Sequence, residues 1–206
     1  IRAIKRVGLE PYAIELESQS IVRACIPQLH SPEARMVVDI GRMRTSFVIF
    51  ARGAIFHTST VEVGGSMLEQ HLIKQLNVTA QEATRIKINT GLDKTEAKGE
   101  IFAALAPVIS SIGDELVRAI SYYHTHTTHA HGATPRIERI FLSGGDANLR
   151  GLDTYLTSIL KVPVERADPF SIIREKLAYN IPPITRREAL AFTTAIGLAL
   201  REIRQD

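Results

Sequence analysis

An aspartate and a glycine at the end of an apolar stretch form the first feature of this chain that suggests chemistry. Residues 36–38 are Met-Val-Val, which favours a buried strand, and Asp39 and Gly41 come next. A carboxylate at the end of such a strand should face an opening, where it can hold a metal-bound water or a hydroxyl. The missing side chain of Gly41 would let backbone N–H groups approach a phosphate. Because ordinary strand-to-turn junctions also carry Asp and Gly, this pair needs support from elsewhere.

Two pairs of adjacent glycines lie where predicted elements meet. They are Gly64-Gly65 and Gly144-Gly145. The second pair follows the apolar run 139–143 and precedes a helix predicted over residues 152–160, and the first precedes a helix with Ser66 as its predicted N-cap. Paired glycines let a flat ligand lie against the backbone, and a helix N-terminus favours an anion. Either pair could also be only a tight turn.

The elements that must position these residues are predicted from hydrophobic patterning. A three-stranded meander is predicted over residues 36–41, 45–50 and 54–63. Further helices are predicted over residues 18–26, 79–91, 100–125 and 187–203, with Ser18 and Thr79 as the N-caps of the first two. Short strands are predicted over residues 11–16 and 162–164. Each candidate residue therefore lies at the end of a strand or beside the start of a helix.

The composition is that of an ordinary globular protein and argues against several classes of function. The chain has 206 residues, of which 45% are hydrophobic and 23% charged, and a formal net charge of +3. Basic and acidic residues are interspersed and Trp is absent, which argues against a nucleic-acid surface. No apolar run approaches the roughly 18 residues of a membrane span, and no signal peptide is visible. The single cysteine, Cys25, excludes a disulfide framework, suits a reducing compartment and is predicted to be buried.

Histidines gather after the long predicted helix. Four of the seven lie between His124 and His131, in a stretch that otherwise holds Thr and Ala. Zinc favours imidazole, but a zinc site needs three or four ligands held in tetrahedral geometry, and no cysteine is nearby. We interpret this stretch as a solvated connector, and His71, beside an apolar helical stripe, as a packing residue.

Taken in order, these features resemble the second half of the actin-like ATPase superfamily. The order is strand-Asp-x-Gly, meander, Gly-Gly-helix, helical insert, strand-Ser-Gly-Gly and an alanine-rich closing helix that ends in Gly-Leu-Ala-Leu at residues 197–200. Within the superfamily the chain is most similar to the type IV pilus assembly protein family PilM, to which the cell-division protein FtsA is related. The resemblance covers essentially the whole chain. It implies an α/β fold, namely a ribonuclease H-like lobe with a mixed five-stranded sheet and flanking helices.

The resemblance also implies a division of the chain between two lobes. Residues 34–185 would form the second lobe, with a helical insert at about 77–100. Residues 1–33 would be a connecting segment that belongs to the first lobe, and residues 186–206 a closing helix that packs on it. The chain begins with Ile1 rather than Met, which fits a processed product, a partial gene or a fragment.

Eight cofactor-binding residues follow from the resemblance, and ATP and Mg²⁺ are the implied cofactors. They are Asp39, Gly41, Thr45, Gly64, Gly65, Lys87, Gly144 and Gly145. The first three fall on the second phosphate loop, where Asp39 would hold Mg²⁺ through a bound water. Gly64 and Gly65 fall on the turn after the meander, and the last two on the adenosine motif. Lys87 lies with Thr84 on the helix that the family places beside the ribose and adenine.

Three departures from the family pattern predict weak nucleotide binding and at most a weak ATPase. The chain has no second Asp-x-Gly hairpin, so the first phosphate loop of the family is absent. Arg42, Met43 and Arg44 stand where small or hydroxyl residues are usual, and Thr84 replaces the acid that the family often places beside the ribose. An arginine there could pair with phosphate oxygens or fill the space of the phosphate. No residue is assigned as a catalytic nucleophile or base.

The function that the resemblance implies is an ATP-binding scaffold of the type IV pilus machinery. Such a protein would be cytoplasmic and peripheral to the inner membrane, and would dock the cytoplasmic tail of a PilN-type inner-membrane protein. Self-association is compatible with the resemblance. The alternatives are an FtsA-like membrane tether of cell division, a kinase or Hsp70-like ATPase on the same fold, and a nucleotide-dead pseudo-ATPase lobe, which Arg42 and Arg44 would favour.

Overall fold

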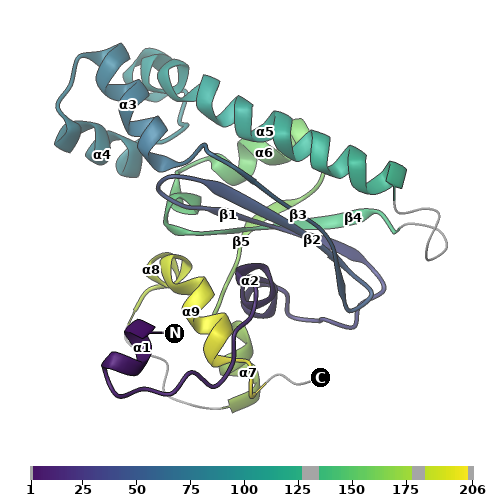
Figure 1. Ribbon diagram of the computed structural model, residues 1–206. Helices are drawn as coiled ribbons and strands as arrows, with labels where there is room; N and C mark the ends of the chain where they lie inside the picture. The colour runs from purple at the N-terminus through teal and green to yellow at the C-terminus, as the bar shows by residue number, and fades with distance from the viewer. Residues whose placement is uncertain (1, 127–134, 178–183, 204–206) are drawn as a thin grey trace.

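The computed structural model describes residues 2–126, 135–177 and 184–203, which are organised around one sheet (Figure 1). The sheet has five strands in the order β3-β2-β1-β4-β5. The strands are β1 Ala34–Ile40, β2 Thr45–Ala51, β3 Ala54–Val61, β4 Ile137–Ser143 and β5 Val164–Arg166. β1, β2 and β3 form an antiparallel meander, whereas β4 is parallel to β1 and β5 is parallel to β4. The predicted α/β fold with a mixed five-stranded sheet is therefore confirmed.

The central strand β1 is covered on both faces. Met36, Val37 and Val38 are each 0% exposed, which explains why β1 is a continuous apolar run and not an alternating one. The edge strand β3 has no fully buried residue, in keeping with its Thr, Ser and His content. The core thus lies around β1 and its two neighbours.

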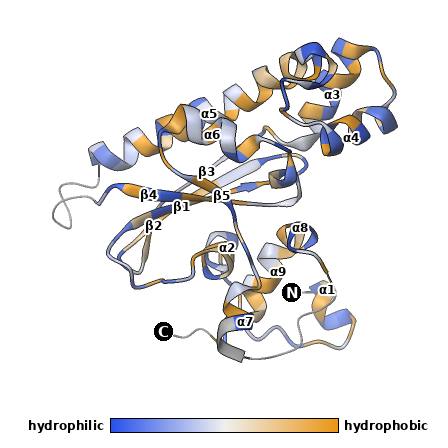
Figure 2. Ribbon diagram, turned by 180° about the vertical axis from the view of Figure 1, so that it is seen from behind, coloured by the Kyte–Doolittle hydropathy of each residue, from blue (hydrophilic) through white to orange (hydrophobic). Residues whose placement is uncertain are grey.

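One face of the sheet carries the helices that follow the meander. They are α3 Gly65–Leu76, α4 Ala80–Asn89, α5 Glu100–His126 and α6 Leu152–Leu160, with the short 3-10 turns η1 Glu96–Gly99 and η2 Gly145–Asn148. α5 and α6 cover the sheet, α3 packs against α5, and α4 packs against α3 (Figure 1). Hydrophobic and hydrophilic residues alternate along α5 (Figure 2), as expected of a helix with one buried side. The N-cap predicted for α4 is confirmed, because Thr79 and Glu82 form a reciprocal capping box.

The opposite face carries elements from both ends of the chain. They are α1 Arg2–Arg6, α2 Glu17–Cys25, α7 Ser171–Leu177, α8 Arg186–Ala189, η3 Leu190–Phe192 and α9 Thr193–Ala199. α2 contacts β1 and β2 and packs against α9. Cys25 is 3% exposed on α2, which confirms that it is a buried residue. None of the helices in the described ranges combines the length and apolarity needed to cross a membrane.

The prediction of a single closing helix over residues 187–203 is wrong, because the structure divides this segment into α8, η3 and α9. The carbonyl of Leu190 accepts hydrogen bonds from the backbone N–H of Gly144, over 3.1 Å, and from the Thr193 hydroxyl, over 2.9 Å. Phe192 has φ −108° and ψ 10°, outside the α-helical region. A contact with the glycine turn after β4 thus interrupts a helix whose composition favours continuity.

Three local predictions near helix starts are also wrong. Residues 9–16 form no strand, since within the described residues no strand lies beside them. α2 begins at Glu17 after Leu16, whose N–H donates to the Gln19 side chain, so Ser18 is not its cap. α3 begins at Gly65 after Gly64, so Ser66 is inside the helix. The connector predicted over 124–131 lies largely outside the described residues.

Gly197 lets α2 and α9 approach very closely. A Cβ placed on Gly197 would lie 1.9 Å from the backbone oxygen of Ser20, so the two helices leave no room for a side chain there. Arg23 Nη1 donates to the Gly197 carbonyl over 2.7 Å and also pairs with Glu15, whose side chain is only 4% exposed. Arg201 contacts the same carboxylate over 2.6 Å. These contacts fix the two ends of the chain to each other.

We expect Gly197→Ala to lower the free energy of unfolding by about 1–3 kcal/mol, because the added methyl group forces α2 and α9 apart. Helix propensity alone predicts the opposite sign. Urea unfolding of the variant measures the difference, and Ala195→Ser, at an exposed position of the same helix, is the matched control. An unchanged or higher stability for Gly197→Ala would contradict the close approach.

Candidate functional site

The candidate site lies where β1 and β4 end side by side. These parallel strands are in register with Asp39 opposite Ser143, so their carboxyl ends reach the same edge of the sheet. Ligands of α/β sheets usually bind outside this edge. On the antiparallel side, Ser46 of β2 is the partner of Asp39. The aspartate predicted from the sequence is therefore flanked by hydroxyl side chains from both neighbouring strands.

Asp39 is a half-buried carboxyl group with hydroxyl and charged side chains nearby. Burial raises its pKa, and Glu17 adds to this, while Ser143 and Arg44 act in the opposite direction. The Ser143 hydroxyl is close enough to lower the pKa of this carboxyl, yet within the described residues it has no partner in good hydrogen-bonding geometry. Complete burial raises the pKa of the nearby Cys25 thiol, so this thiol is unreactive. A cation beside Asp39 would offset the cost of burying its charge.

The turn after β1 rests on the turn before α3. The Gly41 N–H donates to the Arg44 carbonyl over 2.9 Å, and the Gly65 N–H donates to the Gly41 carbonyl over 3.0 Å. The Ser66 N–H donates to the Arg42 carbonyl over 2.8 Å. Two of the predicted ligand-binding turns are thus joined by their own backbones.

Two of the predicted glycines are required by backbone packing. A Cβ on Gly64 would lie 2.5 Å from the Gly41 carbonyl oxygen. Gly144 has φ +86°, and a Cβ there would lie 2.3 Å from the oxygen of Ile40. No other residue fits either position, whether or not a ligand binds. Gly145 differs, because a Cβ there would make only an ordinary contact, 3.9 Å from the Ala191 Cβ, and the residue is exposed.

Thr45 has a structural partner for its hydroxyl. The side chain is fully buried at the start of β2, and Oγ1 donates to the Val63 carbonyl over 2.7 Å. Thr84, on α4, donates in the same way to the Ala80 carbonyl over 3.1 Å. Neither hydroxyl proton is free for a ligand in this arrangement.

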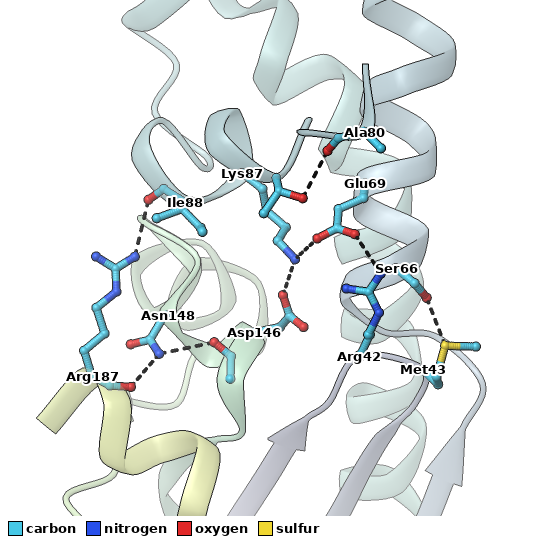
Figure 3. A network of polar contacts seen from close by, with 12 residues as sticks. Arg42, Met43, Ser66, Glu69, Ala80, Lys87, Ile88, Asp146, Asn148 and Arg187 are labelled. Atoms are coloured by element: carbon cyan, nitrogen blue, oxygen red, sulfur yellow. Dashed lines mark hydrogen bonds and ion pairs between the residues drawn. The ribbon is translucent and has the colours of Figure 1, made fainter. Parts of the chain in front are cut away.

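A network of buried charges spans the cleft between α3, α4 and η2 (Figure 3). Lys87 Nζ lies 2.8 Å from Glu69 Oε1 and 2.6 Å from Asp146 Oδ1, and these side chains are 10%, 10% and 14% exposed. Burial lowers the pKa of Lys87, but its two carboxylate partners outweigh this and raise it. Burial raises the pKa of Glu69, but Lys87, with help from Arg42, lowers it overall. Lys87 and Glu69 are therefore charged at neutral pH.

The two arginines of the loop after β1 point to acids and do not fill the loop. Arg42 Nη2 lies 3.4 Å from Glu69 Oε2, and Arg44 Nη2 lies 3.5 Å from Glu17 Oε2. Their side chains are 72% and 62% exposed. The Arg44–Glu17 pair is exposed on both sides and contributes little to stability, so Arg44 can change partner at small cost, whereas Arg42 pairs with a buried acid.

The far end of the cleft is closed by Asn148 and Arg187. Asn148 Nδ2 donates to the carbonyls of Arg187, over 2.8 Å, and Gly145, over 3.2 Å. Arg187 Nη2 donates to the Ile88 carbonyl of α4 over 3.4 Å (Figure 3). The cavity between them is about 30 Å³. Small-molecule sites usually offer roughly 300 Å³ or more, so a nucleotide base would need this end to open.

Sequence reasoning missed four residues of this site, namely Glu69, Asp146, Asn148 and Arg187. A signal was present for the first, because Glu69 follows Leu68 on the stripe that also carries Leu72, and an acid at such a position requires a cation. Asp146 follows directly after the glycine pair, where an acid is a second candidate for a polar role. Asn148 and Arg187 lie 39 residues apart, and nothing local connects them.

Comparisons with known proteins agree with one another. A family model described as type IV pilus assembly protein PilM matches residues 3–203 of this chain. The cell division protein FtsA of Neisseria meningitidis serogroup B is 26% identical over 221 residues, covering 96% of this chain and 49% of that protein. The chain spans about half the length of the curated FtsA relatives it matches.

Two solved structures show the fold. A PilM-PilN type IV pilus biogenesis complex matches with a TM-score of 0.75 and 22% identity over 98% of this chain and 56% of the matched chain. MreB5 of Spiroplasma citri bound to ADP matches with a TM-score of 0.72 and 17% identity over 98% of this chain and 63% of the other. An archaeal actin homologue matches as well. The fold is therefore actin-like.

We expect Asp39→Asn to raise the free energy of unfolding near pH 7, by on the order of 1 kcal/mol, because it removes a buried charge. In the folded protein the pKa of Asp39 lies above its ordinary value of 3.8. The cost of burying the Asp39 charge is therefore fully present above the folded-state pKa, and it disappears as the pH falls below 3.8. Urea unfolding between pH 7 and pH 3 measures this, with the exposed Glu62→Gln as control. If Asp39→Asn is more stable by the same amount at every pH in this range, burial of the Asp39 charge is not the cause of the added stability.

Proposed function

The chain belongs to the type IV pilus assembly protein PilM family, and from this premise we propose that it is a nucleotide-binding lobe of an actin-like pilus-assembly scaffold. The observation that carries the proposal is the convergence of Asp39, Lys87 and the glycine turns at one edge of the sheet. In this proposal ATP binds with Mg²⁺ along that edge, and the eight predicted residues contribute to the site. The bound nucleotide regulates assembly, and turnover is slow or absent.

The described residues fit such a ligand at its phosphate end. The Asp39 carboxyl is disfavoured as an anion by burial and would gain from a hydrated cation beside it. Gly145 is exposed, and Arg42 and Arg44 are exposed cations on the adjoining loop. Bound Mg²⁺ would neutralise phosphate charge.

Ligand retention is sufficient for a scaffold. Two lobes can exist in an open and a closed arrangement. A nucleotide that contacts both lobes shifts the equilibrium between these arrangements by as much as its affinity for them differs. We place the full protein at the cytoplasmic face of the inner membrane, docked on the cytoplasmic tail of a PilN-type protein. This part of the proposal is supported by the family and by the fold shared with the PilM of the PilM-PilN complex. An FtsA-like tether is the second candidate, because FtsA relatives match nearly the whole chain.

The division into lobes is part of the same proposal. Residues 34–185 form the second lobe, and residues 1–33 and 186–206 contact the first. Support comes from the segment before α2, where apolar side chains are exposed. They are Val7 at 72%, Leu9 at 62%, Tyr12 at 82%, Ile14 at 75% and Leu16 at 69%. The last three occupy every second position, so their side chains share one face if the segment is extended. Such an apolar face suits burial against another sheet.

Titration of Mg-ATP tests the nucleotide proposal. We expect the longest native form of the protein to bind Mg-ATP, and Asp39→Ala to weaken binding by tenfold or more, because the ligand of the hydrated cation is lost. Isothermal titration calorimetry of both forms measures this, with the tail peptide of the inner-membrane partner as a second ligand. Absence of nucleotide binding at millimolar ATP, with the tail peptide still bound, would leave a pseudo-ATPase scaffold.

Hydrogen exchange tests the division into lobes. We expect the amides of residues 12–15 to exchange slowly in the longest native form and rapidly in the 206-residue chain, because a second lobe would cover this segment. Mass spectrometry of peptic fragments measures the difference, and β1 amides, central to the sheet in both forms, are the internal control. Equal exchange of residues 12–15 in both forms would show that no second lobe covers them.

A further inference from the structure

A side chain of the protein itself fills the space between two glycine turns of the cleft. A Cβ placed on Gly65 would lie 1.9 Å from Asp146 Oδ2 and 2.3 Å from Oδ1. The carboxylate therefore lies directly against the backbone of the first residue of α3, although Asp146 belongs to η2 on the other side of the cleft. A ligand that enters between Gly65 and Gly145 has to move this carboxylate.

The ion network assigns unequal roles to its two acids. Glu69 has two cationic partners, Lys87 at 2.8 Å and Arg42 at 3.4 Å. Within the described residues, Asp146 pairs with Lys87 alone. If Asp146 leaves, Lys87 keeps Glu69 as its counter-ion, so no buried charge is left unpaired on α4. Asp146 is thus the acid of this network that a ligand can replace.

Movement of Asp146 requires no rearrangement of the backbone around it. Asn148 anchors η2 to the carbonyls of Gly145 and Arg187, and the Leu92 N–H donates to the Arg150 carbonyl over 2.8 Å. None of these bonds involves the Asp146 side chain. Displacement of this side chain from Gly65 would therefore leave these backbone bonds in place, and the side chain is already 14% exposed.

We propose that Asp146 is a built-in competitor for the nucleotide, and that it determines the affinity of the cleft. Its carboxylate occupies the cleft until a nucleotide displaces it, and Lys87 holds it in place. This inference rests on the proposed nucleotide-binding function. It also adds a reason for the weak binding predicted from the sequence. That prediction rested on the missing first phosphate loop, on the arginines of the loop after β1 and on Thr84, whereas the structure also places an acid directly against Gly65.

Nucleotide affinity of Asp146 variants is the direct test. We expect Asp146→Gly, in the longest native form, to bind Mg-ATP and Mg-ADP at least tenfold more tightly than the unaltered protein, because the competitor is gone. Asp146→Asn should give a smaller gain, since it keeps the shape and loses the charge. Asp114→Asn is the matched control, because Asp114 is an exposed residue of α5. Unchanged or weaker binding by both Asp146 variants, with the unaltered protein binding normally, overturns this inference alone.

A second readout tests the contact without any nucleotide. Lys87 should react slowly with an amine-directed acetylating reagent in the unaltered protein and several-fold faster in Asp146→Asn, as measured by mass spectrometry of the modified peptide. An equal labelling rate means that Asp146 does not hold Lys87, which contradicts the inference. If Lys87 labelling accelerates but no form binds Mg-ATP or Mg-ADP, the ion pair is confirmed, while competition and the proposed nucleotide function both fail.

Discussion

The parallel pairing of β1 with β4 is the interaction on which the rest of this structure depends. Parallel neighbours require a long crossover, and here the chain between β1 and β4 contains β2, β3, α3, α4 and α5. The crossover therefore brings Lys87 on α4 back to the edge at which both strands end. The register that puts Asp39 opposite Ser143 also packs the Gly144 turn on Ile40. A one-residue slip would turn Asp39 to the other face and remove the site.

The glycines of the cleft illustrate two separate demands on one residue type. Gly64 and Gly144 are dictated by the approach of neighbouring backbone, which leaves no room for a Cβ. Gly145 is not under this constraint, and it is exposed. A motif that looks uniform in sequence thus combines positions that hold turns together with a position that leaves backbone accessible.

The cleft concentrates charge where the fold would be more stable without it. Burial makes the Asp39 carboxylate unfavourable, and the ammonium group of Lys87 is buried between two carboxylates, those of Glu69 and Asp146. Such arrangements cost stability and are usually kept for binding or switching. The network also links α4 to the sheet edge, so a ligand that disturbs it changes how the insert is held.

The sequence by itself determined the parts of this protein whose signals are local. The continuous apolar run of β1, the Thr79 N-cap of α4 and the apolar stripe of α5 were predictable because each depends on residues a few positions apart. The order of these motifs also determined the family. Tertiary structure alone decided the break after Leu190, the absence of a strand at residues 9–16 and the pairing of Lys87 with Asp146. Each depends on groups that are distant in the chain, and the cost of burying a charge or a backbone group is known only when its neighbours are in place.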